Sequence, residues 1–148
     1  MAKLKKPKPD LLVIGWMEYL DLPDLGLSQI KAKIDTGART SALHATNIAP
    51  FISNGEEWVR FQIKPDTDVP EIWVETPIHD RRAIKNTSGI PEERIVIRTN
   101  LKLTDRSWPI SVSLTDRSKM RFPMIVGRSA LKQHNIAVHT RRATLTSN

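Results

Sequence analysis

The chain has no cysteine among its 148 residues, which excludes disulfide bonds and zinc sites built on thiolates. Aromatic residues make up only 5% of it, so we do not expect a stacking platform for nucleic-acid bases. No apolar run approaches the roughly 20 residues of a membrane span. The basic N-terminus lacks the apolar region and small residues of a signal peptide. We therefore expect a cytoplasmic protein that binds neither membranes nor nucleic acid.

The length and composition are typical of one globular domain. Hydrophobic residues account for 39% and charged residues for 26% of the chain, and the net charge is +7. The first ten residues carry four lysines against one aspartate, or +3 of that charge, together with two prolines. We predict that residues 1–10 form a disordered basic tail and that residues 11–148 form a single domain.

Apolar residues recur at every second position in most of the chain, which is the period of a half-buried strand. Residues 94–115 contain two such runs around Thr104 to Arg106, which predicts a hairpin. Asn54 and Gly55 predict a tight turn that leads into another strand. A short helix is predicted from about residue 128 to 134. Further strands are predicted over residues 11–20, 27–34, 71–78 and 135–140. The pattern therefore favours a mainly β domain, folded as a small closed barrel with one short C-terminal helix.

One alternating run ends in an acidic residue at Asp35, which Thr36 and Gly37 follow. On their own these residues are also typical of a turn, because Asp and Thr side chains bond nearby amides and glycine accepts positive φ.

A second motif lies near the C-terminus, where the apolar residues 124–126 end at Gly127 and Arg128. A glycine at the end of a buried strand allows another backbone to approach closely. Alone, this pattern is equally typical of a strand-to-helix turn.

Together the two motifs, in this order and separated by β-hairpins, resemble the retropepsins, the retroviral-type aspartic proteases. The segments at 30–45, 81–89 and 116–131 are similar to a bacterial and archaeal branch of that fold. Its members are often labelled ATP-dependent zinc proteases, or are encoded beside glutamate ligases of the ATP-grasp type. The resemblance extends from about residue 14 to residue 138.

The resemblance implies a retropepsin-like (acid protease) barrel and an aspartic-type peptidase. In such enzymes two carboxylates lie so close that one keeps a proton while the other takes a proton from water. The matching catalytic residues here are Asp35, Thr36 and Gly37. Because the chain has one such triad, the second aspartate must come from another copy, and we expect a homodimer that uses its terminal strands as the interface. The resemblance also places Ala38 and Gly127 at the substrate site.

A flexible cover, or flap, is expected at residues 79–94, with its tip at 86–89, where closing would exclude water. Retroviral relatives usually carry an acidic residue at the position of Arg39, and that residue pairs with an arginine that matches Arg128. This chain has Arg39 instead of the acidic residue, so the pair is lost. We expect both arginines to bind substrate. The flap adds Arg81, Arg82 and Lys85. Clustered arginines suit carboxylates, so we predict an acidic or glutamate-rich peptide substrate, unless neighbouring acids neutralise the arginines.

The sequence does not support the zinc site or the ATP binding that the family label mentions. The histidines, His44, His79, His134 and His139, form no His-Glu-x-x-His motif, and no glycine-rich phosphate loop is present. We expect no metal and no cofactor, and we expect His44 to be structural. Two alternatives stay open: a dimeric peptide-binding module without catalysis, and a metal-dependent hydrolase on the same fold.

Overall fold

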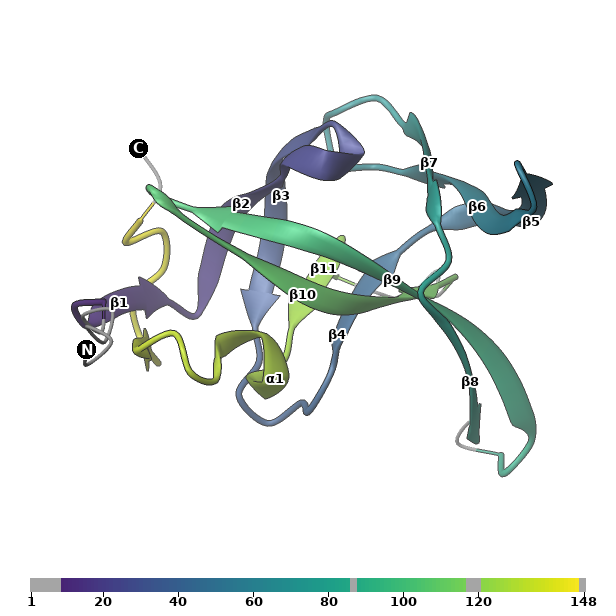
Figure 1. Ribbon diagram of the computed structural model, residues 1–148. Helices are drawn as coiled ribbons and strands as arrows, with labels where there is room; N and C mark the ends of the chain where they lie inside the picture. The colour runs from purple at the N-terminus through teal and green to yellow at the C-terminus, as the bar shows by residue number, and fades with distance from the viewer. Residues whose placement is uncertain (1–8, 86–87, 117–120, 147–148) are drawn as a thin grey trace, which may run out of the picture.

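The computed structural model describes residues 9–85, 88–116 and 121–146, with only the backbone of residues 84 and 85 (Figure 1). Short strands dominate this part of the chain, with one single-turn α-helix and one 3-10 turn at Pro23–Leu25. The elements are β1 (Leu12–Gly15), β2 (Met17–Leu22), β3 (Leu27–Ile34), β4 (Ser41–His44), β5 (Thr46–Ser53), β6 (Glu56–Ile63), β7 (Ile72–Pro77), β8 (Asp80–Lys85), β9 (Pro91–Leu103), β10 (Arg106–Thr115), β11 (Met124–Val126), α1 (Arg128–Leu131) and β12 (Ile136–His139).

Six strands close into a barrel in the order β10-β4-β11-β3-β2-β9, and β9 returns to pair with β10. Side chains from every one of these strands fill the interior, so that Leu20, Ile30, Leu43, Ile97 and Met124 are all at most 1% exposed. Burying each such side chain stabilises the fold by about 1.5–3 kcal/mol. The closed barrel predicted from the period-two pattern is confirmed.

The hairpin of β9 and β10 forms the longest wall of the barrel, as the alternation predicted. Leu103 pairs with Arg106 across a tight turn in which Thr104 has a φ of +56°. The turn at Asn54 and Gly55 is likewise confirmed, because both residues have positive φ, as a tight hairpin turn of this kind requires. That turn joins β5 to β6 in a separate three-stranded sheet with β7.

The two ends of the described chain meet at one end of the barrel (Figure 1). Strands β1 and β12 pair in parallel, with Leu12 opposite Ile136. Close by, the fully buried carboxylate of Glu18 accepts hydrogen bonds from the amides of Gly15 (2.6 Å), Leu145 (2.8 Å) and Thr146 (3.2 Å). This carboxylate therefore ties the segment after β12 to the start of β2.

The N-terminal residues that the structure describes are also tied to the barrel. The carbonyl of Pro9 accepts a hydrogen bond from Asn135 (2.9 Å), and the carbonyl of Asp10 accepts one from Arg106. The remainder of the expected basic tail, residues 1–8, lies outside the described residues.

Helix α1 is shorter than predicted and ends at Leu131 instead of residue 134. The backbone of Lys132 is extended, and Gln133 and Asn135 have positive φ, which a helix cannot accommodate. Among the residues described, no helix is long and apolar enough to span a membrane.

Replacing Glu18 by alanine should lower the free energy of unfolding by about 2–4 kcal/mol, because it leaves buried amides without an acceptor. Glu56→Ala, at an exposed site on β6, is the matched control and should change it by less than about 0.5 kcal/mol. Urea unfolding followed by circular dichroism measures both values. Equal stability of the two variants would show that the Glu18 contacts do not hold the fold.

Candidate functional site

The two sequence motifs lie side by side at one end of the barrel. Strand β3 pairs in parallel with β11, with Ile34 opposite Val126. Directly after this pair, the amide of Asp35 donates to the carbonyl of Val126 at 2.9 Å. The chain therefore brings the Asp-Thr-Gly segment to the start of the Gly-Arg segment, although 90 residues of sequence separate them.

The Asp35 carboxylate is half-buried and oriented by its own loop. Its Oδ1 accepts a hydrogen bond from the amide of Gly37 at 3.0 Å, and the Asp35 carbonyl accepts one from the amide of Ala38 at 3.1 Å. A Cβ at position 37 would lie 3.2 Å from Oδ1. A glycine here therefore leaves the carboxylate accessible while its amide holds it in place.

Gly127 allows the backbone of the Asp35 loop to pass directly against it. A Cβ at this position would lie 2.5 Å from the carbonyl oxygen of Thr40, which no side chain could tolerate. The Gly127 amide donates to the hydroxyl of Ser41 at 3.0 Å, and the next amide, of Arg128, donates to the carbonyl of Ala38 at 2.8 Å. The close backbone approach predicted for Gly127 is confirmed.

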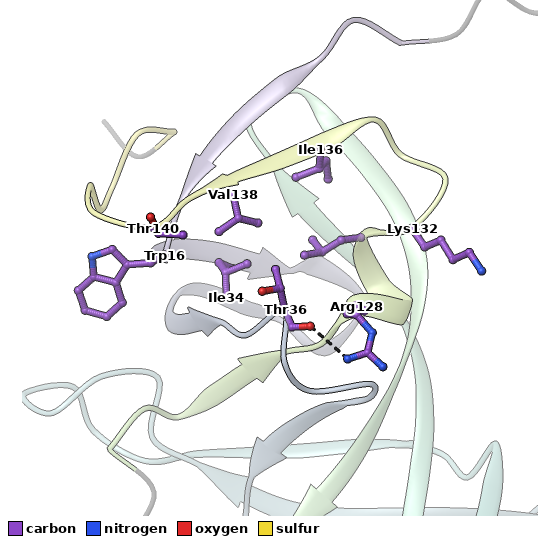
Figure 2. Close-up of a pocket in the computed structure, with 9 residues that line it drawn as sticks. Trp16, Ile34, Thr36, Arg128, Lys132, Ile136, Val138 and Thr140 are labelled. Atoms are coloured by element: carbon purple, nitrogen blue, oxygen red, sulfur yellow. Dashed lines mark hydrogen bonds between the residues drawn. The ribbon is translucent and has the colours of Figure 1, made fainter.

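The Arg128 side chain binds the Asp35 loop itself. Its guanidinium donates to the carbonyls of Thr36 (3.1 Å) and Gly37 (3.2 Å), and Figure 2 shows the bond to Thr36. From the sequence, Arg128 is expected to bind substrate, because the acidic residue that usually pairs with it is missing. Backbone carbonyls take the place of that acid, so the structure gives Arg128 a positioning role.

An apolar groove of about 660 Å³ opens beside Thr36, between α1 and the terminal strands (Figure 2). Its wall includes Trp16 before β2, Ile34 at the end of β3, and Ile136 and Val138 on β12. We call this surface the apolar groove. It places the hydroxyl-bearing Thr36 at the edge of a wide nonpolar surface.

Strands β8 and β9 form a long hairpin that extends away from the barrel (Figure 1), as we predicted for residues 79–94. Asp80 pairs with Val96 at its base, and Lys85 pairs with Pro91 near its tip. Of the expected tip, residues 86 and 87 lie outside the described residues, as does the side chain of Lys85.

The arginines of this hairpin lie on different faces, because side chains alternate along a strand. Arg81 binds Glu93 (2.6 Å) and Glu57 (3.5 Å), and the hydrogen bond to Glu93 raises the pKa of Arg81. Arg82 binds Asp80 at 3.0 Å, and this hydrogen bond lowers the pKa of Asp80. Neighbouring acids therefore contact both arginines, and two of them contact Arg81.

Arg82 and Arg39 line the same cavity, of about 450 Å³, between the hairpin and the Asp35 loop. We call it the arginine cavity. Its other walls are Val96 on β9 and several hydroxyl-bearing residues, namely Thr40, Ser41, Ser111, Ser113 and Ser129. Among the residues that the structure describes, Arg39 forms no ion pair. Of the predicted arginines, the structure thus brings Arg39 and Arg82 together and directs Arg81 and Arg128 elsewhere.

Arg94 is a residue that the sequence analysis missed. It lies directly opposite Arg82 in the hairpin and on the same face as Val96, which lines the arginine cavity. Its side chain is only 12% exposed, its nearest ion-pair contact is Glu92 at 3.9 Å, and its Nε has no hydrogen-bond partner among the described residues. Two cations placed directly opposite each other repel, and the hairpin register would have revealed this pair.

Among the described residues, no three His, Asp or Glu side chains lie close enough together to hold a metal ion. His44 lies at the pairing of β4 and β10, with its Nδ1 3.2 Å from the carbonyl of Thr115. That contact is consistent with the structural role expected for His44.

Comparison with known proteins identifies the family. Residues 13–147 match the model of the RimB-like family, described as retropepsin-like aspartic endopeptidase RimB, and the chain belongs to this family. Two relatives named probable alpha-L-glutamate ligase, from Parasynechococcus marenigrum and Desulfotalea psychrophila, are 43% and 45% identical over 81% and 80% of the chain. The chain spans about a quarter (26%) of the length of these relatives.

A solved structure has the same fold. A protein of unknown function from Legionella pneumophila superposes with a TM-score of 0.74 at 31% identity, over 90% of this chain and 97% of the other. The retropepsin-like barrel expected from the two motifs is therefore confirmed by the family model, and this neighbour has the same fold as the chain.

Replacing Arg128 by alanine should lower the free energy of unfolding by about 1.5–3 kcal/mol, the usual worth of hydrogen bonds to a charged group. The same variant should speed hydrogen exchange at the Ala38 amide, since its loop loses two anchors. Arg141→Ala removes an equal charge from an exposed position and should leave both measurements unchanged. Unaltered exchange at Ala38 in Arg128→Ala would contradict the positioning role.

Proposed function

We propose that this member of the retropepsin-like family is a homodimeric aspartic peptidase whose two Asp35 carboxylates, one from each copy, activate a shared water molecule. The observation that carries the proposal is the fixed Asp35 loop, held by the Gly37 amide, the Arg128 guanidinium and the backbone contact at Gly127. Catalytic groups must be held in position by rigid surroundings. The chain contains one Asp-Thr-Gly segment, so a pair of carboxylates needs a second copy.

In the proposed reaction, the ionised carboxylate accepts a proton from the water, and the water oxygen attacks the carbonyl carbon of the peptide bond. The protonated carboxylate donates its proton to the carbonyl oxygen, which gives a tetrahedral diol. The diol collapses as the C–N bond breaks: the carboxylate that took the water's proton donates it to the nitrogen, and a hydroxyl of the diol gives its proton to the other carboxylate. The products are a carboxylic acid and an amine, and the carboxylate pair again shares one proton.

The terminal sheet and the apolar groove support the dimer. Within the described chain, β1 and β12 pair with each other and with no third strand, which leaves the outer edges of this small sheet available. Leu11, Val13 and Trp16 in the same region are 60%, 44% and 36% exposed. A two-fold related copy seated here would cover these apolar side chains and bring Thr36 of each copy to the interface.

The arginine cavity supports an acidic substrate. Arg39 and Arg82 both line it; among the described residues Arg39 has no ion pair, and Arg82 has a single carboxylate partner, Asp80. A carboxylate entering this cavity would satisfy these donors in bidentate fashion. The names of the relatives refer to glutamate, which fits a glutamate-containing peptide. The hairpin of β8 and β9 would close over such a peptide and exclude water.

Asp35→Asn should keep the fold and the dimer and lower peptide hydrolysis by at least about 10²–10⁴-fold, because an amide cannot act as the base. Activity of the unmodified protein should fall on dilution as the dimer dissociates, and chelators should have no effect. Analytical ultracentrifugation and a peptide cleavage assay measure these outcomes. Full activity of Asp35→Asn would refute the paired-carboxylate mechanism, and loss of turnover with a chelator would point to a metal-dependent hydrolase.

Cleavage of matched peptides that differ only in glutamate or glutamine should favour glutamate, and the preference should shrink at high salt. Arg39→Ala and Arg82→Ala should each reduce it by about tenfold, the usual effect of losing a charged hydrogen bond. Arg81→Ala, which removes the same charge from an arginine bound to Glu57 and Glu93, should leave the preference unchanged. Equal rates for both peptides at low salt would rule out the acidic specificity while leaving the peptidase proposal intact.

A further inference from the structure

A second cavity, of about 350 Å³, adjoins the arginine cavity and shares Ser111 and Ser129 with it. It lies outside the Asp35 loop, between β9, β10 and the segment that follows α1. Its basic and titratable lining residues are Arg98, Lys132 and His134. We call it the outer cavity.

The charges of the outer cavity are uncompensated within the part of the chain that is described. None of its lining residues is acidic, and neither Arg98 nor Lys132 forms an ion pair there. Arg98 donates instead to the hydroxyl of Ser111 at 3.0 Å. By contrast, Arg81 on the neighbouring strand β8 contacts two glutamates. Two cations facing one cavity without a carboxylate favour an anionic ligand.

The walls of the outer cavity are firmly built. The His134 ring stacks on Trp108 with a centroid distance of 4.5 Å, and the Trp108 Nε1 donates to the carbonyl of Ala130 at 2.7 Å. Burial lowers the pKa of His134, so its ring is mainly neutral at pH 7 and offers one N–H donor. Lys132 lines both this cavity and the apolar groove, and in Figure 2 the end of its side chain is directed away from the other groove residues drawn.

We propose that the outer cavity is a binding site for an oxyanion, a phosphate or carboxylate group held between Arg98 and Lys132. The Ser129 hydroxyl on the same wall supplies a further donor. The volume exceeds that of a single phosphate, so the group can belong to a larger molecule. Two sources carry this chemistry: a free phosphate-bearing ligand, or a side-chain carboxylate of a peptide that reaches across Ser111 from the arginine cavity. The site itself does not depend on peptide hydrolysis.

Titration of the protein with inorganic phosphate at low ionic strength tests the proposal. We expect saturable binding by isothermal titration calorimetry and a shift of the Trp108 indole N–H signal in nuclear magnetic resonance spectra. Lys132→Ala and Arg98→Gln should each weaken binding by at least about tenfold. Lys102→Ala, which removes an exposed charge from the same strand as Arg98, should weaken it less than about twofold. Absence of saturable binding, or equal weakening by all three variants, would overturn the proposal.

Two further measurements determine where the anion binds and which kind of molecule supplies it. Arg82→Ala should leave the phosphate-dependent shift of the Trp108 indole N–H signal in place, and loss of that shift in this variant would place the anion in the arginine cavity and overturn the proposal. A pentaglutamate peptide is then added to the phosphate-loaded Asp35→Asn protein. Displacement of phosphate by this peptide, with no displacement by a matched pentaglutamine peptide, identifies a peptide carboxylate as the source. Retention of phosphate with the peptide bound identifies a separate phosphate-bearing ligand. Neither outcome depends on whether the peptide is cleaved.

Discussion

The structure depends on one close backbone contact, where Gly127 meets Thr40 at the mouth of the barrel. The parallel pairing of β3 with β11 brings two loops to the same edge, and the absence of a side chain at Gly127 lets them touch. Hydrogen bonds from the Gly127 and Arg128 amides and from the Arg128 guanidinium then hold the Asp35 loop from two sides. Aspartate is common in turns. Here the contact fixes the loop and thereby fixes the position of the Asp35 carboxylate.

Most of the barrel could be predicted from the sequence because its signals are local. The strands on either side of Thr104, and the strand that follows Asn54 and Gly55, have alternating apolar residues and adjoin tight turns with positive φ. Strand β5 escaped prediction because it is largely exposed and contains Pro50, which hides its period. Helix α1 was predicted too long because its end depends on the positive φ of Gln133 and Asn135, which composition alone does not reveal.

The candidate site divides in the same way. Asp35 and Gly127 each belong to a recognisable sequence motif, so both residues could be identified from the sequence. The partners of the arginines could not, because they depend on which strand face each side chain occupies. Adjacent residues Arg81 and Arg82 lie on opposite faces: Arg81 contacts two glutamates, and Arg82 lines a cavity. Arg94 gains its significance only from the register that sets it opposite Arg82.

The pairing of β1 with β12 joins residues near position 12 to residues near position 136. Among the described strands, β1 precedes all the others in the sequence and β12 follows them, so this pair can form only after the strands between them have been synthesised. Contacts between such distant residues are slow to form because a long loop must close first. During that interval the barrel strands between them can pair, while Ile14 and the wall that β12 supplies beside Thr36 are still unprotected. We therefore expect the surroundings of Thr36 to form late in folding, and we expect a chain that lacks β12 to carry the motif without its apolar wall.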